Sequence, residues 1–246
     1  MREIKVELRK QFLQPYFYLA WFILNGIMAF LSYQLCNEGA IVRIEGSENV
    51  TYDEIMTSII ILAHQVGLVA VVLALLCWQT FGKEADQRYM TCYVLSTRNK
   101  WTYIFAKVAV VTFSFTLIII CTIATMMGIY ELLQPAHLSF ALNGHTWLTI
   151  IQQVAVVILC GMMFISLTAV ISLRFGVIGV LFTTVGLAIV SSIFSQNLYI
   201  KDFIPLNLLT ISESQSFFQH AGLLTLYIFI CLVGLRFYTK HKEIAV

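Results

Sequence analysis

Charged residues are scarce in this chain. They make up 11% of its 246 residues, whereas soluble domains contain about 25%. Hydrophobic residues make up 59%, and the mean hydropathy is +0.85. A soluble protein of this composition could not cover its surface with polar side chains. The composition therefore excludes a disordered protein, a nucleic-acid-binding domain and an ordinary cytosolic enzyme, and it indicates an integral membrane protein.

Motifs of catalysis and cofactor binding are also missing. The sequence contains no GxxxxGK[ST] phosphate-binding loop, no HExxH zinc motif and no GxSxG nucleophile motif, and its six cysteines form no CxxC pair. No Asp or Glu lies near the middle of a long apolar stretch, where carriers coupled to protons or sodium place carboxylates. We therefore expect no enzymatic activity, metal site or cofactor in this chain itself.

Proline is rare as well, and its three occurrences all fall outside the long apolar stretches, where helices are expected to begin or end. A helix that crosses a bilayer needs about 20 mostly apolar residues, and six stretches meet or approach that length. The expected fold is an all-α polytopic membrane protein, with a single transmembrane domain over residues 1–246. The six transmembrane helices are expected at about residues 16–35, 55–81, 106–130, 146–173, 177–195 and 217–238.

The basic residues are distributed unevenly among the connections between these stretches. Thirteen of the fifteen lie before the first, between the second and third, between the fourth and fifth, or around the end of the sixth, whereas Arg43 and Lys201 fall on the opposite side. Because basic loops stay in the cytoplasm, both termini are expected to be cytoplasmic in a plasma membrane. The sequence leaves open whether the Asn49 sequon in the first external loop is used.

Two segments outside the spans carry further information. Residues 1–15 predict an amphipathic elbow helix at the membrane surface, with Ile4, Leu8 and Phe12 on one face and four basic residues toward the headgroups; the alternative is a solvated basic tail. Residues 82–100 are charged but hold apolar anchors such as Leu95, which predicts a short helix that docks into a partner; the alternative is a solvated loop.

Small and polar residues mark the spans themselves. A stripe of small residues at helical spacing allows another helix to approach closely, either a second copy of the chain or a neighbour in the same chain. A few polar side chains could line a route, although His64 could equally be bonded to a neighbouring helix. The stripe is Gly176, Gly179, Thr183 and Gly186, and the polar residues are Asn25, Gln34, His64 and Gln65. Residues 197–220 are partly apolar and are expected to form an external, re-entrant hairpin.

Together these features resemble the permease subunit of ABC-2-type transporters. That family has an elbow helix, six spans with both ends inside, a coupling segment between spans two and three, and an external hairpin between spans five and six. The most specific stretch of the resemblance runs from Glu84 to Lys107. The family pattern is met there by Glu84, Thr91, Val94, Leu95, Arg98 and Lys107, whereas Met90 replaces a usual glycine and Ser96 and Thr97 replace a proline-containing pair.

The resemblance implies specific partners. Two permeases, identical or paralogous, would assemble with two separately encoded P-loop ATPase subunits, and ATP and Mg would be bound by the ATPases. Spans one, two and five would line the route between the two permeases. Contacts to the ATPase would come from Glu84, Arg88, Thr91, Leu95 and Arg98, with Arg174 as a smaller second contact.

The substrate is less defined. Small permeases of this kind resemble bacterial exporters of antimicrobial peptides, or permeases that give immunity to bacteriocins, so an amphipathic peptide is expected. Lipid-linked glycans and small drugs remain open, as does the choice between export and immunity. Two other function classes also remain: a gradient-driven carrier or channel, and a non-transporting membrane scaffold or sensor.

Overall fold

A computed structural model describes residues 2–36, 56, 59–60, 62–63, 67–82, 100–133, 144–194 and 214–241, and the following statements concern these residues. Nearly all of them are helical and none is in a strand, which confirms the expected all-α class for this part of the chain. The helices are α1 (Arg2–Leu13), α2 (Pro15–Cys36), α4 (Leu68–Cys77), the π-helix η1 (Trp78–Gly82), α7 (Lys100–Leu133), α8 (Gly144–Phe194) and α9 (Ser214–His241).

Four helical segments are long and apolar enough to cross a membrane: Pro15–Gln34, Trp101–Leu133, Trp147–Ser172 and Phe217–Phe237. They correspond to the first, third, fourth and sixth predicted spans. The shorter apolar segment Leu68–Phe81 corresponds to the second half of the second predicted span. The positions of these helices confirm that long apolar runs, rather than alternating ones, determine the fold.

Local sequence explains where two of the helices begin. Pro15 is the first residue of α2, a position where its fixed φ suits the helix and its missing N–H has no helical partner to lose. Gly67, directly before α4, has a φ of 78°. That left-handed conformation strains residues that carry a side chain, so glycine allows the chain to turn into α4.

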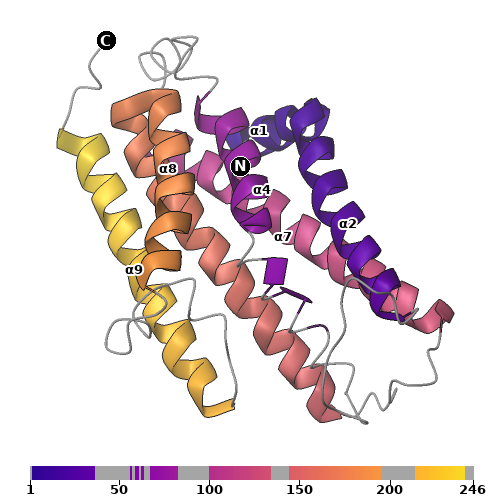
Figure 1. Cartoon of the computed structure of the whole chain (residues 1–246). Helices are drawn as coiled ribbons and strands as arrows, with labels where there is room; N and C mark the ends of the chain where they lie inside the picture. Colours follow the sequence, from indigo (N-terminus) through magenta and orange to yellow (C-terminus); the bar gives the residue numbers. More distant parts are fainter. Residues whose placement is uncertain are drawn as a thin grey trace.

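The helix α8 is 51 residues long and does not run straight. A Cβ atom added to Gly179 would lie 3.0 Å from the carbonyl oxygen of Ile171, eight residues earlier, although eight residues of a straight helix climb about 12 Å. The axis therefore turns back sharply between them. In Figure 1 the later part of α8, drawn in orange, runs beside the earlier part and beside α9. The fourth and fifth predicted spans thus lie within one bent helix, with Arg174 in the bend.

The centre of the bundle is formed by α7 and the first part of α8, which pack directly on each other. In each of these two helices, 56% of the most apolar stretch is buried inside the bundle. The corresponding share is 33% in α2 and 17% in α9. The ring of Phe115 in α7 covers Gly161 in α8, where it fills the space that a Cβ would need. The outer helix α2 packs on α7, α9 packs on α8, and α4 packs on α2 and α8.

Several chain segments meet at one end of the bundle (Figure 1). The helix α1 lies there, together with the beginnings of α2 and α7, the end of η1, the bend of α8 and the end of α9. These are the segments that carry most of the basic residues. The segments predicted from their charge to share one side of a membrane therefore lie at one end of the described bundle.

Candidate functional site

The face of α1 that packs on the bundle is polar. Glu7 and Gln11, one helical turn apart, are 6% and 3% exposed, whereas Ile4 and Leu13 are 40% and 73% exposed. The expected amphipathic helix is thus present, but its most deeply buried residues are polar, and Leu8 and Phe12 of the expected apolar face are only half-buried. Apolar and basic side chains of α1 remain available on the outside, as an interfacial helix requires. The exposed basic side chains are Lys5, Arg9 and Lys10.

Gln11 joins α1 to the π-helix. Its backbone carbonyl accepts a hydrogen bond from Nε2 of Gln79 at 3.3 Å, and its Oε1 accepts one from Oγ1 of Thr80 at 3.0 Å. The same Thr80 hydroxyl lies 3.0 Å from the carbonyl oxygen of Leu76 in α4, the helix that leads directly into η1. Because a hydroxyl has a single hydrogen, it divides between the two acceptors. All three side chains of the Gln11, Gln79 and Thr80 group are buried.

Lys107 joins α7 to the same π-helix. Its side chain is fully buried, its Nζ donates to the backbone carbonyl of Thr80 at 3.0 Å, and it lies 4.9 Å from the centre of the Tyr103 ring. Carbonyls in the last turn of a helix lack helical partners, and the dipole makes this end negative. Lys107 therefore caps the end of a neighbouring helix, and the carbonyl, the dipole and the ring stabilise its buried charge.

The position of Lys107 differs from the one that the charge count gave it. The charge-based prediction of topology placed Lys107 with the basic residues of the loop between spans two and three. In the structure α7 begins at Lys100, so Lys107 lies in its second turn, facing the core. An ionisable residue inside an apolar helix is usually functional or structurally paired. The contacts of Gln11 and Lys107 connect five neighbouring residues through Thr80 and Tyr103. We call these residues the polar cluster: Gln11, Gln79, Thr80, Tyr103 and Lys107.

The polar cluster lies at the base of the predicted coupling segment. The π-helix ends at Gly82 and α7 begins at Lys100, so the bond between Thr80 and Lys107 connects the two flanks of residues 83–99. A π-helix is rare and often occurs at functional positions. The predicted ATPase contacts of this segment lie outside the described residues: Glu84, Arg88, Thr91, Leu95 and Arg98.

The predicted route residues separate into two groups. Asn25 is buried, donates from Nδ2 to the Trp21 carbonyl at 3.0 Å, and accepts at Oδ1 from the Thr125 hydroxyl at 3.2 Å. It therefore joins α2 to α7 within the chain. Gln34 lies near the far end of α2 and is half-buried. His64 and Gln65 lie outside the described residues.

The small-residue stripe also has two parts. Gly179 is buried against the backbone of Ile171, and its carbonyl accepts a hydrogen bond from the Thr183 hydroxyl at 2.6 Å. Nothing lies within 4 Å of a Cβ built on Gly186. The close approach at Gly179 is thus internal to the bent helix, whereas the space beside Gly186 is open. Gly176 and Arg174 lie in the bend, and the structure describes only their backbone.

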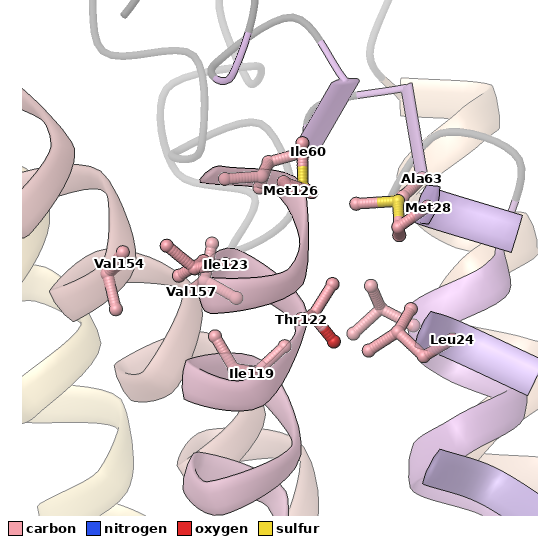
Figure 2. A pocket seen from close by; sticks show the side chains of 11 residues that line it. Leu24, Met28, Ile60, Ala63, Ile119, Thr122, Ile123, Met126, Val154 and Val157 are labelled. Atoms are coloured by element: carbon pink, nitrogen blue, oxygen red, sulfur yellow. The ribbon is translucent and has the colours of Figure 1, made fainter. Parts of the chain in front are cut away.

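A small cavity lies between α2, α4, α7 and α8 (Figure 2). Its volume is about 20 Å³, enough for one water molecule. The lining is apolar except for Thr122, whose hydroxyl donates to the Ile118 carbonyl at 2.8 Å. Such a cavity stays dry and is far too small for a peptide. Its lining residues are Leu24, Met28, Ile60, Ala63, Val69, Ile119, Thr122, Ile123, Met126, Val154 and Val157.

Gln11, Gln79 and Thr80 were not among the residues predicted from the sequence. Two signals were present: Glu7 and Gln11 form a polar pair at helical spacing inside a basic and apolar segment, and Gln79 and Thr80 interrupt an apolar run just before Gly82. Neither signal identifies its partner, because the partners are far apart in the chain. Among the described residues, no group of three or more His, Cys, Asp and Glu side chains could hold a metal ion.

Comparisons with family models, with curated proteins and with solved structures give no match for this chain. The resemblance to ABC-2 permeases therefore rests on the arrangement of segments and on the stretch from Glu84 to Lys107.

Proposed function

We propose that this chain is the transmembrane permease subunit of an ATP-driven exporter of the ABC-2 type. The observation that carries the proposal is the polar cluster at the base of residues 83–99. It ties the end of η1, the second turn of α7 and the elbow-like helix α1 together by buried hydrogen bonds. A segment that receives force from a partner needs such a firm base, because force on a loose loop would be absorbed by the loop.

The proposed topology has six spans with both termini in the cytoplasm of a bacterial plasma membrane. The four long apolar helices support it directly. The bend of α8 supports separate fourth and fifth crossings, since the helix turns back instead of continuing for its full 51 residues. The α4 and η1 pair would be the inner half of the second crossing.

The proposed mechanism is a rigid-body switch. Glu84, Arg88, Thr91, Leu95 and Arg98 would dock on a P-loop ATPase, which binds ATP and Mg. Closure of two ATPases would displace residues 83–99, and the polar cluster would carry the displacement into α7, η1 and α1. The bend at Arg174 lies at the same end of the bundle, which supports its role as a second contact. ATP would drive the change because the ATPases bind one permease conformation better than the other.

The proposed route lies between two permease copies. The cavity between α2, α4, α7 and α8 is too small for a peptide, and we place the path at the surface of the bundle instead. Outer faces of α2 and of the later part of α8 expose large apolar side chains, including Phe22, Phe30 and Phe182. The open space beside Gly186 lies on the same part of α8. An amphipathic or antimicrobial peptide is the substrate class that suits such apolar walls.

Affinity purification from native membranes in a mild detergent, followed by mass spectrometry, tests this function. The proposal predicts a stoichiometric P-loop ATPase with the wild-type chain and its loss in the Glu84→Ala, Arg98→Ala double variant. Lys201→Ala, on the predicted external side, should retain the ATPase and serves as the control. A chain that repeatedly purifies without an ATPase would contradict the proposal and would favour a gradient-driven carrier or a scaffold.

A further inference from the structure

The contacts between α1 and the bundle are both polar and apolar. The residues of α1 that are buried most deeply are Glu7 and Gln11, while Ile4, Val6 and Leu13 are exposed. The helix α1 packs mainly on α7, and Phe12 is half-buried against the core. The hydrogen bonds of Gln11 to Gln79 and Thr80 add directed contacts between α1 and η1.

Thr80 is the centre of this connection. Its hydroxyl donates to Gln11 on one side, and its carbonyl accepts from Lys107 on the other. These residues are 69 and 27 positions away from Thr80 along the chain. One residue of a π-helix thus links a surface helix to a core helix.

The cluster also contains a second, unused pairing. Nε2 of Gln11 and Oε1 of Gln79 are both buried, and neither has a hydrogen-bond partner among the described residues. One is a donor and the other an acceptor, and the two side chains already meet through the Gln11 carbonyl. A bond between these two atoms would add to the bond from Thr80 to Gln11 and would hold α1 on η1 more firmly.

We propose that Gln11, Thr80 and Lys107 form a polar latch that makes α1, η1 and the second turn of α7 move as one unit. A displacement of residues 83–99 would then move α1 at the membrane surface as well. That consequence rests on the proposed function, whereas the latch itself does not need an ATPase. The latch makes the position of α1 depend on Lys107, which lies on a different helix.

Hydrogen–deuterium exchange of the full chain in lipid nanodiscs tests the latch. Thr80→Val removes the hydroxyl at almost constant volume, and Thr80→Ser keeps it. Lys107→Met removes the ammonium group. The latch predicts that amide exchange in residues 2–13 rises about tenfold or more in Thr80→Val and in Lys107→Met, and stays near the wild-type rate in Thr80→Ser. Thr225→Val is the matched control, because that exposed threonine donates to Ala221 of its own helix.

A reciprocal measurement separates a latch from a local contact. Gln11→Leu should raise exchange in residues 78–82 and 100–107, because coupling between two sites acts in both directions. If α8 and α9 keep wild-type exchange, the fold is intact and the result for α1 is interpretable. If Lys107→Met unfolds the chain, the exchange rates of Thr80→Val and Gln11→Leu still test the latch.

Unchanged exchange of α1 in Thr80→Val, or unchanged exchange of η1 and α7 in Gln11→Leu, would overturn the latch and show that contacts other than the Thr80–Gln11 bond hold α1. The measurement uses the chain without a partner. A failed latch therefore leaves the proposed exporter untouched, and a missing ATPase in the purification would leave the latch untouched.

Discussion

The middle of the bundle and the α1 end are held together by different kinds of contact. In the middle, α7 and α8 approach so closely that the Phe115 ring covers Gly161, and the cavity beside them is apolar. At the α1 end, Gln11, Thr80 and Lys107 are joined by hydrogen bonds inside a buried site. The difference shows that close packing holds the middle of the bundle, whereas directional bonds contribute to the position of α1 against it.

The two kinds of contact also differ in how they respond to change. A packed interface fails when an atom is added, because dense interiors have little free space. A hydrogen-bonded site fails when a donor or acceptor is removed, because the remaining partner stays buried and unsatisfied. Substitutions of opposite character should therefore break the two regions.

Gly161→Leu is expected to have the largest effect. The added side chain would overlap the Phe115 ring and separate α7 from α8, and overpacking of this kind costs about 3 kcal/mol of unfolding free energy. Reversible unfolding in bicelles or nanodiscs measures the change. Gly222→Leu in α9 is the control, since nothing lies within 4 Å of a Cβ at that position. If both variants lost the same unfolding free energy, the close contact between Phe115 and Gly161 would not be the cause of the loss.

Lys107→Ala should come next. It leaves the Thr80 carbonyl buried without its ammonium donor, which costs about 2 kcal/mol of unfolding free energy. The same unfolding measurement applies, with Lys5→Ala on the exposed side of α1 as the control. If Lys107→Ala were as stable as wild type, the charge at the α1 end would have no structural role.

Thr125→Val tests a polar contact in the middle of the bundle and sharpens the comparison. It removes the bond to Asn25, and such bonds between membrane helices contribute about 0.6 kcal/mol on average. A double-mutant cycle with Asn25→Leu isolates this pair. Thr116→Val, whose hydroxyl donates to Thr112 in its own helix, gives the baseline. A coupling as large as the loss at Lys107 would show that the middle also depends on directional bonds.

The smallest expected effect is a pH dependence caused by the buried thiol of Cys36, at the far end of α2. Cys36 is buried, and burial raises the pKa of its thiol to about 11. Since the folded state favours the thiol over the thiolate, this preference stabilises the fold below the ordinary cysteine pKa and is lost as pH rises through about 11. Maleimide labelling at neutral pH should therefore be slow and should accelerate with pH.

The labelling is measured in a variant that keeps Cys36 and replaces the other five cysteines. A Lys5→Cys variant of that chain, also lacking Cys36, gives the rate for an exposed site. Labelling of Cys36 as fast as that of the exposed site would show that this end of α2 opens readily.

The same contrast explains what could be predicted from the sequence. The spans of α2, α7, α8 and α9 were predictable because membrane helices appear as long apolar runs, which need no knowledge of their neighbours. The beginning of α7 was placed six residues late, because Lys100 and Lys107 were counted as loop charges. The bend of α8 was expected as a loop, since a local pattern does not reveal that helical bonds continue through a turn.

The polar cluster could not be predicted in the same way. Gln11 bonds to residues 68 and 69 positions away, and Lys107 bonds to one 27 positions away. Such pairs depend on which helices become neighbours, and only the folded chain determines this. The sequence predicted an amphipathic surface helix at α1 but did not predict that Glu7 and Gln11 would be its most deeply buried residues.

The most direct test of whether residues 83–99 contact a partner is photocrosslinking in native membranes. A photoreactive amino acid replaces Thr91 in the full chain. The proposal predicts covalent capture of a P-loop ATPase from position 91, and none from the same probe at Lys201 on the predicted external side. Capture of the ATPase from both positions, or of no ATPase from position 91, would contradict the proposal that residues 83–99 couple this chain to an ATPase.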